Sequence, residues 1–264
     1  MRHARLRTLC MMTVVTLAAA TASTPTTARG NDKPVKRASS HLKLAHTLYE
    51  AGRLGEALGA VTEAISADPK YVQAHQLRGM ILFNMDQMQD AKKEFEKTLS
   101  LDQNYTDARI YLGTTLVHLN NGEEALRAYQ KALEDLTYPW PERIHFNIGL
   151  LHQREGRTDD AIASFKKSIS LNPSYAPGYY ELGKIHEGMG RTQEAIRSYT
   201  DALVGLDSSA DLHLRLGLAL MKAGDATKAK EHFEKVIQLA PGESREAVEA
   251  RDQIDLIKKK TPAS

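Results

Sequence analysis

The sequence predicts an all-α fold, a solenoid of six helical hairpins closed by a C-terminal helix, and three regularities predict it. An alanine recurs with spacings of 34, 34, 36, 34 and 34 residues, at Ala57, Ala91, Ala125, Ala161, Ala195 and Ala229. A bulky residue stands four positions after each alanine, at Val61, Phe95, Tyr129, Phe165, Tyr199 and Phe233. A small residue stands twelve positions before it, at Ala45, Gly79, Gly113, Gly149, Gly183 and Gly217. Fixed periods of this length are typical of repeat architectures.

Each unit is expected to be two antiparallel helices. The alanine and the bulky residue lie one helical turn apart and so share one buried face. The small residue belongs to the preceding helix, where it lets the two helices approach closely. Glycines stand five residues before four of the alanines, where the first helix should end: Gly52, Gly156, Gly190 and Gly224. Prolines stand twelve residues after three of them and should end the second helix: Pro69, Pro173 and Pro241.

The unit resembles the tetratricopeptide repeat, most completely where Leu182-Gly183 is followed by Gly190 to Ala195, Tyr199 and Ala202. The resemblance implies a right-handed superhelix. It covers residues 38–243 as units 38–71, 72–105, 106–139, 142–175, 176–209 and 210–243. Because a hairpin cannot bury its apolar face alone, the units should stack into one continuous core that needs a terminal cap. Residues 244–264 are expected to be that capping helix and a short tail.

The N-terminus is expected to direct export. Arg2, Arg5 and Arg7 precede an apolar stretch from Leu9 to Ala20, so residues 1–22 are typical of a secretory signal peptide. Residues 23–37 should form a flexible lead-in. Cys10 precedes the apolar stretch, whereas a lipid-modified cysteine would follow it. We therefore expect a periplasmic or outer-membrane-associated protein, with a mitochondrial presequence as the alternative.

Composition excludes several classes of protein. The chain is 42% hydrophobic and 26% charged, which is typical of a folded domain and not of a disordered one. Its net charge of +2 becomes −1 once the three N-terminal arginines are removed, so no nucleic-acid surface is expected. No integral membrane segment is expected in the mature chain, which we predict to be monomeric.

No catalytic, metal or cofactor site is predicted. Among ten histidines, four occupy the same position of their units and should be packing residues spread along the solenoid: His41, His75, His145 and His213. The sequence has no G-x-S-x-G motif, phosphate-binding glycine loop or dinucleotide fingerprint. The hairpins and the cap leave no room for a catalytic domain, so we expect a protein that is not an enzyme.

The resemblance to the tetratricopeptide repeat implies that the first helix of each unit builds a concave groove, through its second, fifth, ninth and twelfth positions. These positions hold a largely apolar set, expected to bind a helix or an extended peptide of a partner protein. The set is Met80, Phe83, Ile110, Val117, Phe146, Leu150, Tyr180, Lys184, Leu214, Leu218 and Met221. The alternative is that several of these residues pack between neighbouring helices. Only Lys184 fits the carboxylate clamp of chaperone-binding members of the family.

The 36-residue spacing marks an insertion, read as Leu136-Thr137-Tyr138-Pro139-Trp140-Pro141-Glu142-Arg143 before Asn147-Ile148-Gly149. This turn resembles that of the pilotin family of type IV pili (the PilF/PilW type). That resemblance implies an envelope factor that helps secretin subunits assemble. Pilotins are typically lipoproteins, so a general periplasmic or organellar adaptor remains the alternative. Two prolines hold Trp140 at low entropic cost, and Tyr138 and Trp140 are predicted as a second contact with the partner. The alternative is that the ring folds down over the junction between units three and four.

Overall fold

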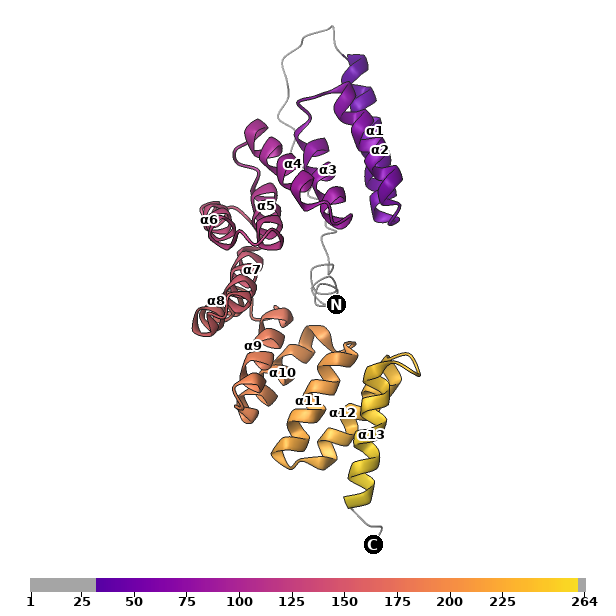
Figure 1. Ribbon diagram of the computed structural model, residues 1–264, viewed down its shortest axis with the longest axis vertical. Coiled ribbons are helices and arrows are strands. Elements are labelled where there is room, and N and C mark those ends of the chain that lie inside the picture. Colours follow the sequence, from indigo (N-terminus) through magenta and orange to yellow (C-terminus); the bar gives the residue numbers. More distant parts are fainter. Residues whose placement is uncertain (1–31, 261–264) are drawn as a thin grey trace.

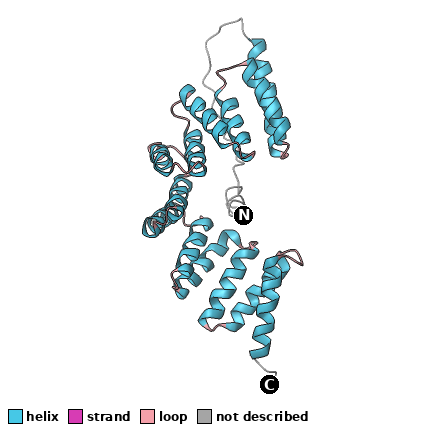
Figure 2. Ribbon diagram, in the orientation of Figure 1, coloured by secondary structure: helices cyan, strands magenta, loops and turns pink. Residues whose placement is uncertain are grey.

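The computed structural model describes residues 32–260, and over that range the chain is thirteen helices with no strand (Figures 1 and 2). The helices are α1 (Asp32–Glu50), α2 (Leu54–Ala67), α3 (Val72–Asn84), α4 (Met88–Leu101), α5 (Thr106–His118), α6 (Gly122–Ala132), α7 (Pro141–Arg154), α8 (Thr158–Leu171), α9 (Ala176–Gly188), α10 (Thr192–Leu206), α11 (Ala210–Ala223), α12 (Ala226–Leu239) and α13 (Arg245–Lys260). The predicted all-α solenoid of six hairpins and a C-terminal helix is confirmed.

The hairpins stack into a curved array, with α1 and α2 at one end and α13 at the other (Figure 1). Each second helix packs on the first helix of the next hairpin, and α13 packs on α12 in the same way. First helices also touch their counterparts in the next unit, as α3 touches α1 and α5, and α13 touches α11. Neighbours come closest on the inside of a curve. The first helices therefore line the inner side, as α5 and α7 do in the middle of the arc in Figure 1.

The contact that closes each hairpin is a glycine against an aromatic ring. A Cβ atom added to Gly79 would lie 2.5 Å from the ring of Phe95, and one added to Gly183 would lie 2.4 Å from the ring of Tyr199. Gly113, Gly149 and Gly217 meet Tyr129, Phe165 and Phe233 in the same way. The first hairpin has Ala45 and Val61 at these positions, both fully buried. Ala45 is larger than the glycine of the other hairpins, and Val61 is smaller than their aromatic residue. Close packing explains this exchange of volume.

The turns inside all six hairpins use one residue with a positive φ angle. Four are the predicted glycines, for example Gly190 at φ 71°. The other two are Asp86 (φ 65°) and Asn120 (φ 62°), at the equivalent position of units two and three. Asp and Asn are the residues besides glycine that adopt this left-handed conformation most readily.

The N-terminal predictions meet the structure only in part. The predicted signal peptide, residues 1–22, lies outside the described residues, as does the lead-in up to residue 31. Helix α1 begins at Asp32 and so includes residues 32–37, which were expected to be flexible. Pro34 lies in the first turn of the helix, where its missing N–H costs no hydrogen bond. Within residues 32–260, no helix combines the length and the apolarity that crossing a membrane requires.

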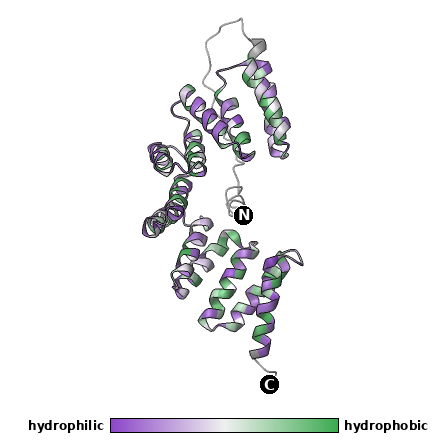
Figure 3. Ribbon diagram, in the orientation of Figure 1, coloured by the Kyte–Doolittle hydropathy of each residue, from purple (hydrophilic) through white to green (hydrophobic). Residues whose placement is uncertain are grey.

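The helices are amphipathic, and both hydrophobic and hydrophilic residues appear along them in Figure 3. Among the buried polar residues are two of the four equivalent histidines, which do more than fill space. His75 lies 2.8 Å from Glu94 Oε2 through Nδ1 and 3.0 Å from the carbonyl oxygen of Pro69 through Nε2. At the equivalent place in unit six, His213 Nε2 lies 2.9 Å from the carbonyl oxygen of Asp207, and its Nδ1 lies 2.9 Å from Nδ1 of His232. Each links the start of its unit to the chain that precedes it.

A matched pair of glycine substitutions tests the closing contact. We expect Gly183→Ala to lower the free energy of unfolding by about 1 to 3 kcal/mol, because the new methyl group overlaps the ring of the buried Tyr199. Gly59→Ala, inside α2 with no atom within 4 Å of the added Cβ, should raise it by about 0.5 to 1 kcal/mol through helix propensity. Urea unfolding followed by circular dichroism measures both. Shifts in the same direction would contradict the account.

The histidine pair predicts a pH dependence of stability. The Asp207 carbonyl can only accept, so Nε2 of His213 carries a proton and His232 Nδ1–H donates to His213 Nδ1. Burial, and then the repulsion that His213 exerts when it is protonated, lower the pKa of His232 below its usual 6.5. The unfolded chain therefore takes up the proton first, and stability falls as the pH drops below about 6.5. His232→Gln should lessen the fall in melting temperature between pH 7.5 and 5.5. An unchanged fall would contradict this assignment.

Candidate partner-binding surface

The candidate site is the inner face, which we define as the side of the first helices turned to the inside of the curve. On α3, for example, Gly79 faces the partner helix, and Leu77 and Ile81 belong to the core shared with the first hairpin. The second, fifth, ninth and twelfth positions of each unit fall on the remaining side of the helix. All eleven predicted groove residues lie at these positions, on α3, α5, α7, α9 and α11.

Seven of the apolar residues are half-buried, and so is Lys184. The seven are Met80, Phe83, Ile110, Val117, Leu150, Leu218 and Met221. Each also packs partly against the core beneath it. Each side chain is held in place by the core and still exposes part of its surface to a partner.

Three predicted groove residues are less than a tenth exposed: Phe146, Tyr180 and Leu214. The ring of Phe146 packs against Phe165 and Tyr175, with ring centroids 5.5 Å apart in both cases. Tyr180 packs against Tyr199 at 6.1 Å. The fifth position of the unit is covered by such neighbours in the last three hairpins. The surface open to a partner there comes from the second, ninth and twelfth positions instead.

Ring contacts fix the part of the inner face formed by units two and three. Phe83 meets the edge of Tyr111 at 6.4 Å and of His118 at 5.2 Å, so its ring is held by the next hairpin. Asn84 donates to the Tyr49 hydroxyl at 2.7 Å, which joins α3 to α1. These contacts make the first three units one preorganised surface.

Arg154 joins the first helices of units three and four. Its guanidinium donates to the carbonyl oxygen of Val117 and to Oδ1 of Asn120, both at 2.6 Å. These acceptors lie at the C-terminal end of α5, where the helix dipole favours a cation. The link fixes the spacing between α5 and α7.

Units five and six carry a polar network that sequence reasoning missed. Arg215 donates to Glu187 Oε2 at 3.1 Å and to Asp211 Oδ2 at 3.1 Å. The hydroxyl groups of Tyr180 and Tyr199 donate to the same two carboxylates. Burial, followed by these carboxylates, raises the pKa of both phenols. The available signal was the i, i+4 pair of Asp211 and Arg215 at the start of α11.

Lys184 is neutralised within its own helix. Its ammonium donates to both carboxylate oxygens of Glu181, at 2.8 and 3.0 Å, and the Glu181 side chain is only 1% exposed. The same ammonium lies 5.4 Å from the centre of the Tyr180 ring. Lys184 therefore adds little positive charge to the inner face.

The insertion before α7 places two aromatic rings next to the inner face. Tyr138 donates to Asp107 Oδ1 at 3.1 Å and meets Trp140 edge-on at 5.8 Å. The guanidinium of Arg143 lies 5.1 Å from the centre of the Trp140 ring. Burial and then Asp107 raise the pKa of the Tyr138 phenol. Leu136, in the same loop, is 94% exposed.

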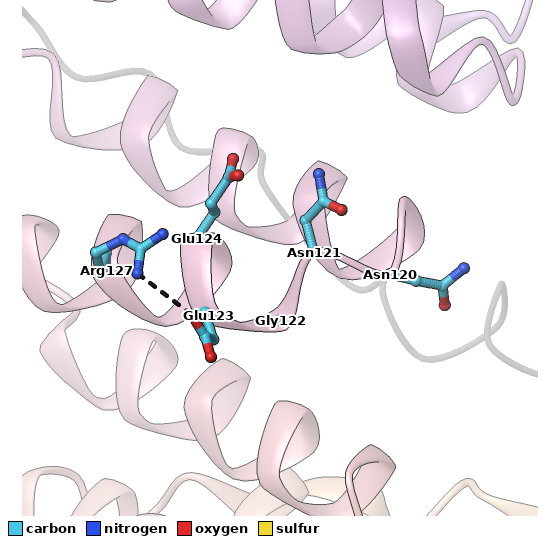
Figure 4. Close-up of a pocket in the computed structure, with 6 residues that line it drawn as sticks. All are labelled: Asn120, Asn121, Gly122, Glu123, Glu124 and Arg127. Atoms are coloured by element: carbon cyan, nitrogen blue, oxygen red, sulfur yellow. Dashed lines mark ion pairs between the residues drawn. The ribbon is translucent and has the colours of Figure 1, made fainter.

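Two hollows lie elsewhere on the described surface. Figure 4 shows one of about 240 Å³ at the turn between α5 and α6, lined by Asn120, Asn121, Gly122, Glu123, Glu124 and Arg127. In it Arg127 pairs with Glu123 at 3.7 Å, and Glu124 is a second acid in the lining. The other, of about 440 Å³, lies between α12 and α13. Neither belongs to the inner face, and no convergent set of apolar side chains marks the first as a peptide site.

Solved structures share the fold. PilW, described as a widely conserved type IV pilus biogenesis factor, is 24% identical with a TM-score of 0.69, over 79% of this chain and 96% of PilW. PilF of Pseudomonas aeruginosa is 20% identical with a TM-score of 0.70, over 85% of this chain and all (100%) of PilF. YrrB, described as a TPR protein with an unusual peptide-binding site, is 19% identical with a TM-score of 0.50, over 73% of this chain and 98% of YrrB.

No curated protein sequence matches this chain. The tetratricopeptide repeat profile matches residues 42–104, 77–141 and 180–244, and a second profile, described as a TPR repeat, matches residues 154–190. Together the matches cover well over half of the chain and include the glycine–aromatic pairs of units two, three, five and six. The chain belongs to the tetratricopeptide repeat family.

Proposed function

We propose that this chain is a non-catalytic interaction scaffold of the cell envelope that holds a helix or an extended peptide of a partner protein in a concave groove along the inner face. The observation that carries the proposal is the set of half-buried apolar side chains on four of the first helices, α3, α5, α7 and α11, from Met80 to Met221. A face that only met water would ordinarily be polar at these positions. Tetratricopeptide repeat proteins act by binding other proteins and are typically not enzymes.

The finer proposal is that the partner is a secretin subunit of a type IV pilus, and that the chain assists assembly of the secretin. PilW and PilF, both type IV pilus proteins by name, share the fold over most of this chain. The aromatic insertion and the export signal read from the sequence also support this function. Export would place the protein in the periplasm or at the outer membrane.

The competing function is a general envelope or organellar adaptor. It is favoured by the position of Cys10 before the apolar stretch, which leaves no cysteine where a lipid anchor would be attached. Capture of secretin subunits from an envelope extract separates the two functions. Recovery of other envelope proteins without secretin would support the adaptor.

Substitutions on the inner face test the site of binding. We expect Leu150→Glu and Met80→Glu to weaken capture of the partner about tenfold or more, because each places a charge against an apolar segment. Val204→Glu is the control, since Val204 is 80% exposed on the second helix α10. It should bind as the wild type does. Pull-down from cross-linked envelope extract, with helical content followed by circular dichroism, measures the effect. Equal loss in all three variants would contradict the proposed surface.

Trp140 provides a test of the second contact, because it is the single tryptophan of the chain. Its ring is half-exposed beside Tyr138, so acrylamide should quench its fluorescence in the free protein. Binding of the partner should shift the emission to the blue and reduce quenching, and Trp140→Ala should cost about 2 kcal/mol of binding free energy. An unchanged emission at saturating partner would rule out the contact.

A further inference from the structure

We propose that the bound segment is apolar where it meets units two to four and carries a basic side chain where it meets units five and six. The inference rests on the proposed function and specifies the chemistry of the partner. The inner face changes from apolar to charged residues along the array. The ninth and twelfth positions hold Met80, Phe83 and Val117 in the early units, but Lys184 and Glu187 in unit five.

The ion-paired groups around Arg215 carry an excess of one negative charge. Glu187 and Asp211 share a single guanidinium, that of Arg215, at 3.1 Å each. Lys184 is already paired with the buried Glu181. The next cation on α11 is Lys222, seven residues beyond Arg215 and so roughly 10 Å further along the helix axis.

Both carboxylates retain an acceptor oxygen without a donor. The hydrogen bonds to Glu187, from Tyr199 and Arg215, reach Oε2. Those to Asp211, from Tyr180 and Arg215, reach Oδ2. Oε1 of Glu187 and Oδ1 of Asp211 therefore receive no hydrogen bond from side chains in the described part of the chain. The two side chains are 39% and 44% exposed, within reach of a partner.

The polar network lies between two apolar parts of the inner face. Leu150 precedes it on α7, and Leu218 and Met221 follow it on α11. A segment lying along this face therefore meets apolar, acidic and again apolar surface in turn. A lysine or arginine flanked by apolar residues matches that order, because an ammonium or guanidinium group supplies the donors that both free oxygens lack.

A pair of synthetic probes tests this chemistry. The two are labelled amphipathic peptides of equal length with identical apolar residues, one carrying a central lysine and the other a glutamate. We expect the lysine peptide to bind about fivefold more tightly in fluorescence anisotropy at low salt. The preference should shrink as salt is raised, since the carboxylates are partly exposed.

Charge-removing variants locate the effect. Asp211→Asn and Glu187→Gln should each reduce the preference for lysine, while Asp201→Asn, which removes an exposed acid from α10, should preserve it. If a variant unfolds, the loss of the lysine preference at high salt, measured on the wild-type protein, still tests the inference. If both peptides bind the wild type with equal affinity and neither binds Leu150→Glu, the proposed preference for a basic side chain is wrong. Binding in the groove would still be supported. If neither peptide binds, this inference fails, and the proposed function survives only if extract capture still depends on Leu150.

Discussion

The structure depends on one recurring contact, in which an aromatic ring of the second helix lies against a glycine of the first in five of the six hairpins. Gly183 against Tyr199 is its tightest example, with room for no additional methyl group. Because the two helices approach so closely, each hairpin is a rigid unit, and the next hairpin can pack on it only in one way. Repetition of that packing bends the array and brings the first helices together on the inner side. The inner face is thus a consequence of a contact that lies beneath it.

Polar groups then link neighbouring units at specific places. Arg154 fixes α7 to the C-terminal end of α5, and Arg215 connects the acids of units five and six. At the fourth position, His75 and His213 reach back to carbonyl groups of the preceding loop. Polar contacts such as these specify geometry more than they add stability, since Arg154 is exposed and Arg215 is only half-buried. They hold the apolar residues of the inner face at fixed positions, which lowers the entropic cost of binding a partner.

Much of this fold could be predicted because its signals are local and repeated. Three features recur at fixed positions of the unit: the alanine, the glycine of the turn and the small residue that precedes each bulky one. Each feature is weak evidence in one unit, but six copies in register make the prediction strong. The same register placed the candidate residues on the inner face. It could not reveal that Phe146 and Tyr180 are covered, because their neighbours Phe165 and Tyr199 lie on other helices and Tyr175 lies in the loop before α9. The network around Arg215 was missed for the same reason. The start of α1 was missed because residues 23–37 were expected to form a flexible lead-in, although the first turn of a helix accepts a proline such as Pro34.

The central claim is that the partner lies along the inner face, and site-specific photocross-linking tests it most directly. A photoreactive phenylalanine analogue would replace Val117 or Leu150 on the inner face, and Val204 on α10, in cells that contain the native partner. The account predicts the same covalent adduct from positions 117 and 150 and none from position 204. An adduct formed only from position 204 would contradict it.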